Sequence, residues 1–350
     1  MSVYGIDPIA DCRWHEFLET RSDASAFHTV GWLKSLEATY GYRPLVFTTS
    51  APGGPLTNGI VLCQIKSWLT GTRWVSLPFA DHCAPLYEEP NDFYMLLDEI
   101  AAESRKAGVD HIEIRPWDVH DLSLAEHTSF RAGERYRLHL LDLRPALDTI
   151  FSSFDRSSVQ RRLRHATREN LTYEEGTTGD ILKKFYHLLV LTRRRHGVPP
   201  QPVAWFKNLL RFLGDRAKIR VASLGDTPIA SVFTLSHKNS VVYKYGCSDE
   251  RYHNLGGMVS LFWQAMQDAK SVGAHTFDMG RSDIDNPGLI RFKSNWGTQD
   301  LPLTYWRFPQ SSSDSLHRWG KAKEIGGNVL SHLPRGFLVA IGNALYRHAG

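Results

Sequence analysis

The sequence contains little that would place it outside the cytoplasm or within a membrane. Four cysteines among 350 residues are widely scattered, without a Cys-x-x-Cys pair or the spacing of a metal site. They predict a reducing compartment and no bound metal. Residues 1–10 lack the basic start and the apolar run of a signal peptide. No segment approaches the roughly 20 apolar residues of a membrane-spanning helix. We therefore expect a cytoplasmic protein.

Motifs of several enzyme classes are also absent. The chain has no Gly-x-Ser-x-Gly, no Walker loop, no His-Glu-x-x-His and no Rossmann glycine pattern after a first strand. His82 and Cys83 follow Asp81, but adjacent side chains of an extended loop point apart, so we do not expect a Cys–His nucleophile.

The composition is that of a folded protein with sizeable cores. Hydrophobic residues make up 42% and aromatic residues 11% of the chain. A length of 350 residues predicts two domains. The net charge is only +4, but basic residues cluster in 156–168 and 193–196. This uneven distribution favours a local anionic partner over general nucleic-acid binding, so we expect no DNA partner.

The predicted elements follow the same order in both halves: helices, a three-strand meander, a helix and two strands. In the first half they are helices 11–20 and 30–40, strands 44–49, 59–66 and 73–77, helix 92–107, and strands 109–115 and 135–143. In the second half they are helices 180–195 and 203–214, strands 218–224, 229–236 and 240–247, helix 258–272, strand 275–280, a turn or helix 287–294, and strand 301–308. A duplicated mixed α/β unit explains this order; independent use of a common βαβ-like element is the alternative.

We therefore predict an α/β fold with mixed sheets, divided into domains 1–145 and 146–310 and a helical tail 311–350. Residues 146–172 form a basic linker helix that opens the second domain. The tail's apolar segment 337–346 has basic residues at its flanks. It predicts a helix docked on the body, with peripheral membrane contact through the tail as the alternative.

A pair of glycines marks the first candidate site. Gly256 and Gly257 open the helix that follows strand 241–247, and Gly273 occupies the position of a left-handed cap. A strand that leads into a helix with glycine in its first turn can hold a phosphate, because backbone N–H groups face the anion. An ordinary strand–loop–helix connection is the alternative. The predicted donor-binding residues here are Tyr245, Leu255, Gly256, Gly257 and Met258.

Several blocks together resemble the acetyltransferase superfamily with the GNAT fold, and more narrowly its FemAB-like branch of double-domain aminoacyl or acyl transferases. The blocks are FHTVGWLKSLEATYGYRPLVF, VSLPFADHCAPL, LTRRRHGVPP, YGCSDERYHNLGG, DMGR and FKSNWG. The resemblance covers most of residues 20–308, and it rests on the order and spacing of the blocks.

The resemblance implies two tandem GNAT-like domains, each a mixed central sheet flanked by helices, and acyltransferase activity. The family is named for enzymes that add amino acids from aminoacyl-tRNA to peptidoglycan precursors, and relatives occur in exopolysaccharide systems. The implied reaction moves an acyl group from acyl-coenzyme A or aminoacyl-tRNA to an amine or hydroxyl of a phosphate-carrying envelope or exopolysaccharide precursor. No tightly bound cofactor is implied.

The sequence departs from the family pattern at two points. The loop His-Asn-Leu-Gly-Gly at 253–257 is not the full Q/R-x-x-G-x-G/A of acetyltransferases that use acetyl-coenzyme A, which leaves the donor open. No long heptad run is present, so the coiled-coil arm of some tRNA-dependent members is missing. Two other functions stay open: a non-catalytic scaffold subunit of a polysaccharide assembly system, and a simple acetyl-coenzyme A-dependent N-acetyltransferase.

Three side chains are the candidates for catalysis. Lys293 matches the lysine of the family's F-K-x-x-x-G element, which implies a positive charge at the developing oxyanion or at a substrate phosphate. The resemblance places the loop around Asp81 at the acceptor site, where the carboxylate serves as base or orients the acceptor. Asp278 is expected to position the acceptor.

The acceptor-binding candidates are two arginines and one tryptophan. Arg162 and Arg164 are candidates for a pyrophosphate because arginine binds phosphate with two parallel hydrogen bonds. Trp32 is a candidate substrate contact, and aromatic core packing is the alternative for it and for Tyr245. The donor, the acceptor and the oligomeric state stay open.

Overall fold

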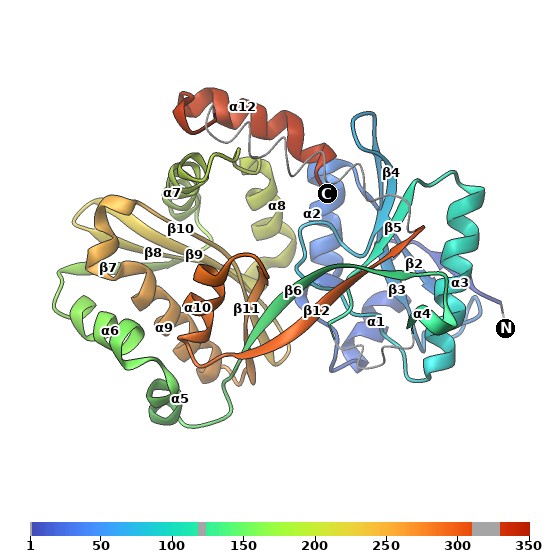
Figure 1. Ribbon diagram of the computed structural model, residues 1–350, viewed down its shortest axis with the longest axis horizontal. Helices are drawn as coiled ribbons and strands as arrows, with labels where there is room; N and C mark the ends of the chain where they lie inside the picture. Colours follow the sequence, from blue (N-terminus) through green and yellow to red (C-terminus); the bar gives the residue numbers. More distant parts are fainter. Residues whose placement is uncertain (1, 118–123, 310–329) are drawn as a thin grey trace. The chain divides into compact units, whose positions relative to one another are not determined.

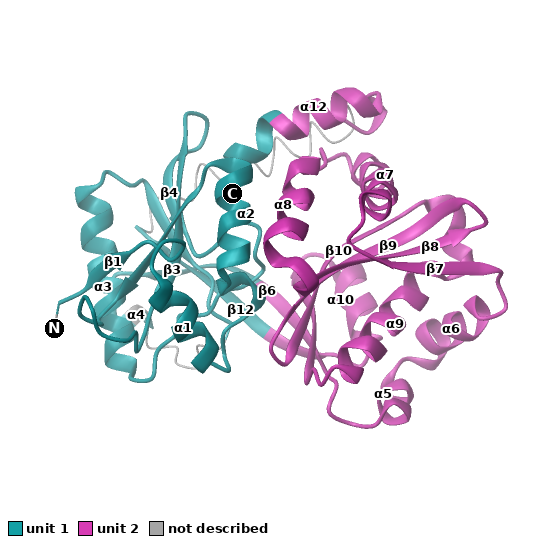
Figure 2. Ribbon diagram, turned by 180° about the vertical axis from the view of Figure 1, so that it is seen from behind, with its two compact units in different colours: residues 1–135, 302–322, 344–350 teal, residues 136–301, 323–343 magenta. Residues whose placement is uncertain are grey.

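A computed structural model describes residues 2–117, 124–309 and 330–350, which divide into two compact units (Figure 2). Of the described residues, unit 1 contains 2–117, 124–135, 302–309 and 344–350, and unit 2 contains 136–301 and 330–343. This division differs from the predicted boundaries at 145 and 310, because the chain re-enters unit 1 at Pro302 and again at Ala344. Each unit is a mixed sheet with helices, so the predicted α/β fold class is confirmed (Figure 1).

In unit 1, two α-helices precede a meander of three strands, and a helix and further strands follow. They are β1 (Tyr4–Ile6), α1 (Cys12–Thr20), η1 (Ala26–His28), α2 (Val30–Tyr40), β2 (Arg43–Thr48), β3 (Ile60–Ser67), β4 (Gly71–Val75), α3 (Pro90–Lys106), β5 (His111–Ile114), α4 (Leu124–His127), the first part of β6 (Arg131–Asp142) and the second part of β12 (Gln299–Phe308). The sheet order is β1-β2-β3-β4-β5-β12, and only β4 and β5 are parallel.

Helix α3 forms the main core of unit 1. It begins with a proline in its first turn, and its apolar residues recur at helical spacing. Phe93, Leu97 and Ile100 are buried on this stripe and belong to one core with Phe47 and Ile112 of the sheet. Burial of such side chains stabilises the unit by roughly 1.5–3 kcal/mol each.

The elements of unit 2 repeat the same connectivity. They are the second part of β6, α5 (Leu147–Ser153), η2 (Arg156–Gln160), α6 (Arg161–Ala166), β7 (Leu171–Gly176), α7 (Gly179–Arg195), α8 (Val203–Leu213), η3 (Gly214–Arg216), β8 (Ala217–Leu224), β9 (Thr227–His237), β10 (Ser240–Ser248), η4 (Glu250–Leu255), α9 (Gly257–Ser271), β11 (Thr276–Asp283), α10 (Pro287–Ser294) and the first part of β12. The sheet order is β6-β11-β10-β9-β8-β7, and only β10 and β11 are parallel.

Helices cover both faces of the sheet in unit 2. Phe233 of β9 and Tyr245 of β10 pack against Phe206 of α8, on the face that α7 also covers. Val232, the neighbour of Phe233, lies instead in a core with Leu261 of α9. Because successive strand residues point to opposite faces, α7 and α8 cover one face and α9 the other.

The described part of the C-terminal tail forms α12 (Arg335–Leu345) and η6 (Tyr346–His348). A Cβ on Gly342 would lie 2.0 Å from the Pro200 carbonyl oxygen, so only glycine allows α12 this approach to unit 2. Leu338 is buried and Phe337 is 66% exposed. Residues 310–329 of the predicted tail lie outside the described residues.

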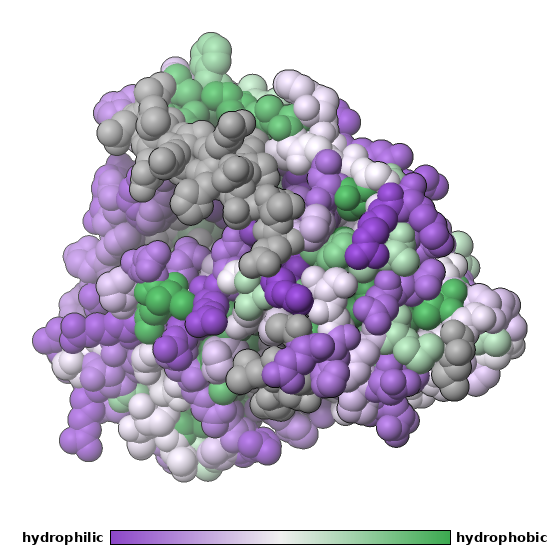
Figure 3. Space-filling view, turned by 45° about the vertical axis from the view of Figure 1, so that its right-hand side comes forward, coloured by the Kyte–Doolittle hydropathy of each residue, from purple (hydrophilic) through white to green (hydrophobic). Residues whose placement is uncertain are grey.

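Hydrophilic side chains predominate on the face drawn in Figure 3, and the apolar ones gather in small groups. Among the residues that the structure describes, no helix combines the length and the apolar character needed to cross a bilayer.

Candidate active site

The parallel strands β10 and β11 separate partway along their length. They pair only from Ser240 to Val242, opposite Thr276 to Asp278. β10 then continues to Ser248 and β11 to Asp283 without pairing to each other. Backbone N–H and C=O groups that face this gap lack their usual strand partner. Ligands of α/β folds bind at such carboxyl ends of parallel strands.

The N-terminus of α9 follows directly on β10. Gly256 has a φ of +76°, and no side chain caps the helix. The N–H groups of an uncapped first turn have no intrahelical acceptor and carry the positive end of the helix dipole. A Cβ on Gly256 would lie 2.9 Å from the Ala166 Cβ, and one on Gly257 would lie 3.1 Å from Ile229 Cδ1. The two glycines therefore also let α9 pack closely on α6 and the sheet.

A pocket of about 360 Å³ opens at this helix end. It contains Gly256, Gly257 and Met258, three of the predicted donor-binding residues, whereas Leu255 packs beside the core below α9. The other lining residues are Arg162, Ile229, Ala230, Ser248, Tyr252, His253, Asn254, Val259 and Phe292. The pocket combines backbone N–H groups, a guanidinium group and apolar walls, and these suit a ligand with a phosphate and an apolar portion.

The described residues that line this pocket include no carboxylate, and their one histidine is neutral. His253 shares a hydrogen bond of 2.8 Å between its Nε2 and the Ser248 hydroxyl. Burial and then the charge of Arg195 lower the pKa of His253, so its ring is neutral at neutral pH. Arg162 reaches the pocket from α6, but Arg164 lines a different pocket and donates to Gln160 at 3.2 Å. The two predicted phosphate ligands therefore do not converge.

Lys293 is buried within α10, with an exposed fraction of 4%. Its Nζ donates to the carbonyl oxygens of Gly280 at 3.0 Å and Arg281 at 2.6 Å. These residues lie where the register between β11 and β6 shifts, and Gly280 has a φ of +72°. Asp278 is buried at the same bulge and accepts from the Gly280 N–H at 2.6 Å. The structure thus brings two predicted catalytic candidates together at the bulge in the middle of β11.

His139 is a buried residue near this bulge that the sequence did not single out. Its position on β6 lies between the residues paired with Asp278 and Arg281. Neither ring nitrogen has a hydrogen-bond partner among the described residues. Burial, followed by the charge of Lys293, lowers the pKa of His139 to about 4. No local motif marks this residue, because its neighbours come from β11 and α10.

The side-chain positions of Trp32 and Tyr245 fit the alternative of core packing, although Tyr245 also lines a pocket of about 440 Å³ beside α7. Tyr245 accepts from Trp205 at 2.8 Å and faces α8, on the side of the sheet opposite to α9. It lies beyond the register shift in β10, so its face could not be predicted from alternation alone. Trp32 is 0% exposed, and its ring contacts Phe27. Both aromatic rings belong to cores, which was the alternative interpretation.

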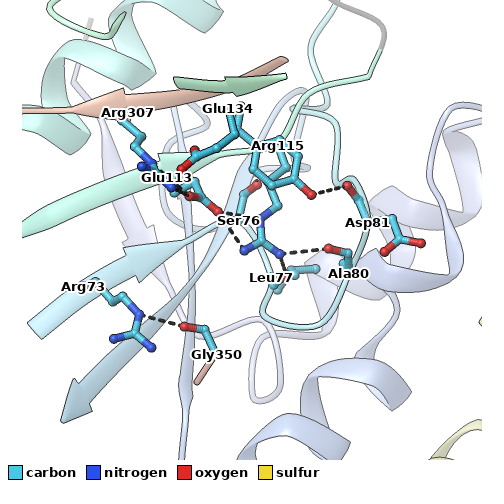
Figure 4. Close-up of polar contacts among 11 residues, drawn as sticks. Arg73, Ser76, Leu77, Ala80, Asp81, Glu113, Arg115, Glu134, Arg307 and Gly350 are labelled. Carbon is cyan, nitrogen blue, oxygen red and sulfur yellow. Dashed lines mark hydrogen bonds and ion pairs between the residues drawn. The ribbon is translucent and has the colours of Figure 1, made fainter. Parts of the chain in front are cut away.

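In unit 1, the loop that carries Asp81 is held by its backbone (Figure 4). Arg115 donates from Nη1 to the carbonyl oxygens of Leu77 at 3.1 Å and Ala80 at 2.8 Å. Tyr305 donates to the Asp81 carbonyl oxygen at 2.6 Å. Leu77 and Phe79 both have a positive φ, which costs of order 1–3 kcal/mol each for residues other than glycine. Figure 4 shows the Asp81 carboxylate turned away from Arg115, so the loop presents it outside this network.

Glu113 anchors Arg115 and ends the parallel pairing in unit 1. It pairs with Val75 of β4 just as Asp278 pairs with Val242 of β10, so the two units place a carboxylate at the same register. Burial would raise the pKa of Glu113, but Arg115 and Arg307, both at 2.7 Å, lower it to about 2. Glu113 is therefore ionised and committed to structure.

The structure gives Cys83 a histidine neighbour, but that histidine is His28. The Cys83 sulfur lies 3.2 Å from His28 Nε2, which also lies 2.8 Å from the Ala84 carbonyl oxygen. The Ser25 N–H donates to His28 Nδ1 at 3.0 Å, so the neutral ring has both nitrogens satisfied. Burial raises the pKa of the Cys83 thiol well above its usual value. This pair is a structural contact between two neutral groups.

We expect His28 to make the protein less stable in acid. Burial lowers the pKa of His28 from 6.5 to about 4. Between these values the unfolded chain binds a proton that the folded chain does not, so stability falls by about 3 kcal/mol as the pH drops from roughly 6.5 to 4. Denaturant midpoints measured across this range should fall less steeply in His28→Gln than in wild type, whereas the exposed His15→Gln should follow the wild-type curve. Parallel curves for all three proteins would contradict the assignment.

Comparison with known proteins gives a family match within unit 2 and similar folds for most of the chain. Residues 153–294 match the family described as "Acetyltransferase (GNAT) domain". The chain is similar to the crystal structure of FemX, with 15% identity, a TM-score of 0.68, and coverage of 87% of this chain and 97% of that chain. It is similar to the C-terminal domain of a putative lysylphosphatidylglycerol synthetase from Agrobacterium fabrum, with 14% identity, a TM-score of 0.59, and coverage of 89% and 95%.

A third similar structure is a tandem GNAT protein from the clavulanic acid biosynthesis pathway, with 11% identity, a TM-score of 0.55, and coverage of 87% of this chain and 97% of that chain. No curated protein matches the sequence. At these identities the similar structures establish the fold, and the family match adds the class of domain. Together they confirm the resemblance to the GNAT fold, with the acetyltransferase domain matched over residues 153–294.

Proposed function

We propose that this acyltransferase, whose residues 153–294 are a GNAT acetyltransferase domain, moves an acyl or aminoacyl group from a thioester or ester donor to an amine or hydroxyl of a cell-envelope or exopolysaccharide precursor. One observation carries the proposal. The uncapped N-terminus of α9 borders a pocket of about 360 Å³, which Ser248 at the end of β10 and Phe292 of α10 also line.

In this proposal, different parts of the donor site bind the phosphates and the acyl group of the donor. Phosphates of the donor bind the N–H groups of α9 and the guanidinium of Arg162. The acyl portion extends toward the gap between the strands, where unpaired backbone groups can bind it. Phe292 lines the pocket, and Lys293 follows it in α10. The buried ammonium of Lys293 stabilises the bulge of β11, because it donates to the carbonyl oxygens of Gly280 and Arg281.

The reaction is an acyl substitution. The acceptor nitrogen or oxygen attacks the donor carbonyl carbon, and the resulting tetrahedral oxyanion requires positive charge or N–H donors nearby. The bond from carbon to the donor's sulfur or oxygen then breaks, and the leaving thiol or hydroxyl takes the proton that the acceptor loses. We assign Lys293 of unit 2 to the oxyanion side of this scheme.

The relatives support both donor classes. One similar structure is named as a synthetase of lysylphosphatidylglycerol, an aminoacylated envelope lipid. The tandem GNAT protein is described as the form without AcCoA, which points to this thioester as a ligand of that protein. The acceptor in this proposal carries a phosphate, as the resemblance to the FemAB-like branch implies.

A second pocket of unit 2 fits the acceptor's phosphate. It has a volume of about 440 Å³ and is lined by Arg193 and His196 beside α7 and by Lys244 of β10, without a carboxylate. Arg193 is half-buried and forms no ion pair with any residue in the described ranges. This pocket lies on the α7 face, so donor and acceptor would approach β10 from opposite faces of the sheet.

The test is direct binding of donors. Acetyl-coenzyme A and a charged tRNA are titrated into the wild-type protein and into Arg162→Met, with binding read by calorimetry. Loss of charge-assisted hydrogen bonds should weaken donor binding by about tenfold or more. Arg161→Met is the matched control, because Arg161 precedes Arg162 on α6 and does not line the pocket. If neither acetyl-coenzyme A nor the charged tRNA binds to the wild type, the proposal is refuted and a scaffold role is favoured.

A further inference from the structure

The most exposed large apolar side chain among the described residues is Trp68, which is 85% exposed. It lies with Leu69, which is 42% exposed, in the turn between β3 and β4. Figures 1 and 2 both show this hairpin projecting from unit 1. Burying a tryptophan is among the largest single gains available to a protein surface. A tryptophan held in solvent at a projecting turn is therefore an interaction site rather than a scattered surface residue.

The turn is held in one conformation. The Ser67 hydroxyl oxygen accepts from the N–H groups of Leu69 at 3.1 Å and Thr70 at 2.9 Å. It also lies 2.9 Å from His348 Nδ1, and the Thr70 hydroxyl donates to the His348 carbonyl oxygen at 3.0 Å. The Trp68 ring meets the His348 ring edge to face at 5.6 Å. The hairpin tip and residues 346–350 thus form one continuous surface.

Positive charge borders the tip. Lys66 and Arg347, which precede Ser67 and His348 in the sequence, are exposed and have no ion-pair partner in the described part of the chain. Residues 330–350 contain no aspartate or glutamate. Asp110, which precedes β5, accepts from the Thr72 N–H at 2.7 Å and packs against Gly71 at the end of the turn, so its charge is bound to the hairpin backbone.

Shape distinguishes between possible partners. A stable protein interface buries roughly 800 Å² on each side, and a projecting turn with two apolar side chains offers far less. A bilayer needs only a few side chains at the headgroup level, where tryptophan is enriched and where basic residues are attracted to anionic lipids.

We propose that the surface formed by Lys66, Trp68, Leu69 and Arg347 binds the headgroup region of an anionic membrane. Trp68 and Leu69 enter the interface, and the two cations contact lipid phosphates. The contact is weak and reversible, because it uses few side chains. It moves the expected membrane contact from the tail helix to the hairpin of unit 1, and it does not depend on the transferase proposal.

The test is co-sedimentation of the full chain with phosphatidylcholine vesicles that contain or lack phosphatidylglycerol. We expect binding only to the anionic vesicles, with weakening at high salt. Trp68→Ser should weaken binding by about tenfold, and Arg347→Gln by about fivefold. Val272→Ser is the matched control, because Val272 is 78% exposed in unit 2, outside the surface.

Phe337→Ser separates the hairpin from the tail helix, because Phe337 is 66% exposed on α12. It should bind vesicles as the wild type does. Loss of binding in Phe337→Ser with retention in Trp68→Ser would overturn the proposal, and so would absence of wild-type binding to anionic vesicles. A thermal unfolding curve for each variant checks that it is folded.

Discussion

Replacing Glu113 by alanine is expected to lower the free energy of unfolding of unit 1 by about 3–5 kcal/mol. The residue is 5% exposed and pairs with Arg115 and Arg307, each at 2.7 Å. Removing the carboxylate takes away the buried counterion that Arg115 and Arg307 share, and Arg307 keeps only its pair with the partly exposed Glu134. It also releases Arg115 from the position in which it binds Leu77 and Ala80. The denaturation midpoint measures the first effect, and hydrogen exchange of the Asp81 loop measures the second.

Glu134→Ala is the matched control for this experiment. Glu134 also pairs with Arg307, at 2.6 Å, but its side chain is 39% exposed. Ion pairs in contact with solvent contribute about 1 kcal/mol or less, so this variant should keep both its stability and the protection of the loop. Equal losses in the two variants would show that burial of Glu113 is not the decisive property.

Replacing Lys293 by methionine is expected to reduce turnover at least tenfold, because about one decade corresponds to 1.4 kcal/mol of lost transition-state stabilisation. The ammonium holds the carbonyl oxygens of Gly280 and Arg281 at the bulge beside the candidate site. Methionine keeps the length of the side chain and removes the charge. Turnover is measured with the donor that binds in the titrations, and a thermal unfolding curve reports the structural cost.

Lys270→Met tests whether that effect is more than the loss of two hydrogen bonds. Lys270 donates in the same way to the carbonyl oxygens of Leu143 at 2.8 Å and Arg144 at 3.1 Å, at the far end of α9. Both variants should lose similar stability, but only Lys293→Met should lose activity. A similar turnover in both would remove Lys293 from the chemistry and leave it as a support for β11.

Much of the fold follows from local patterns. The glycine-opened helix after β10 is α9, and the meander strands of both units agree with the alternation of apolar residues. The prediction omitted β1, α4 and β7, which are short or lie at an edge of a unit's sheet and carry little apolar periodicity. It also took residues 146–172 as one helix, where the structure has α5, η2, α6 and the start of β7. The boundaries between the two units could not be predicted from local patterns either, because β12 returns to pair with β5, which is far away in the sequence.

The candidate site likewise has residues that local sequence predicts and residues that only the tertiary structure places. Gly256, Gly257 and Met258 do line a pocket, because helix starts and glycine conformations depend on a few adjacent residues. The face of Tyr245 and the partners of Lys293 depend on a register shift in β10 and a bulge in β11, and neither leaves a signal in composition. His139 escaped notice for the same reason.

The sequence alone determined the order of the elements, the repeat of a strand–helix–strand unit and the carboxylates Glu113 and Asp278 at matching positions. Only the tertiary structure decided what those carboxylates do. Glu113 meets two arginines, one of them from a strand nearly 200 residues later, whereas Asp278 binds the backbone of its own bulge. Hydrophobic periodicity and turn chemistry act over a few residues and so can be read locally. The charge state of a buried group is set by whatever the fold brings within a few ångströms of it.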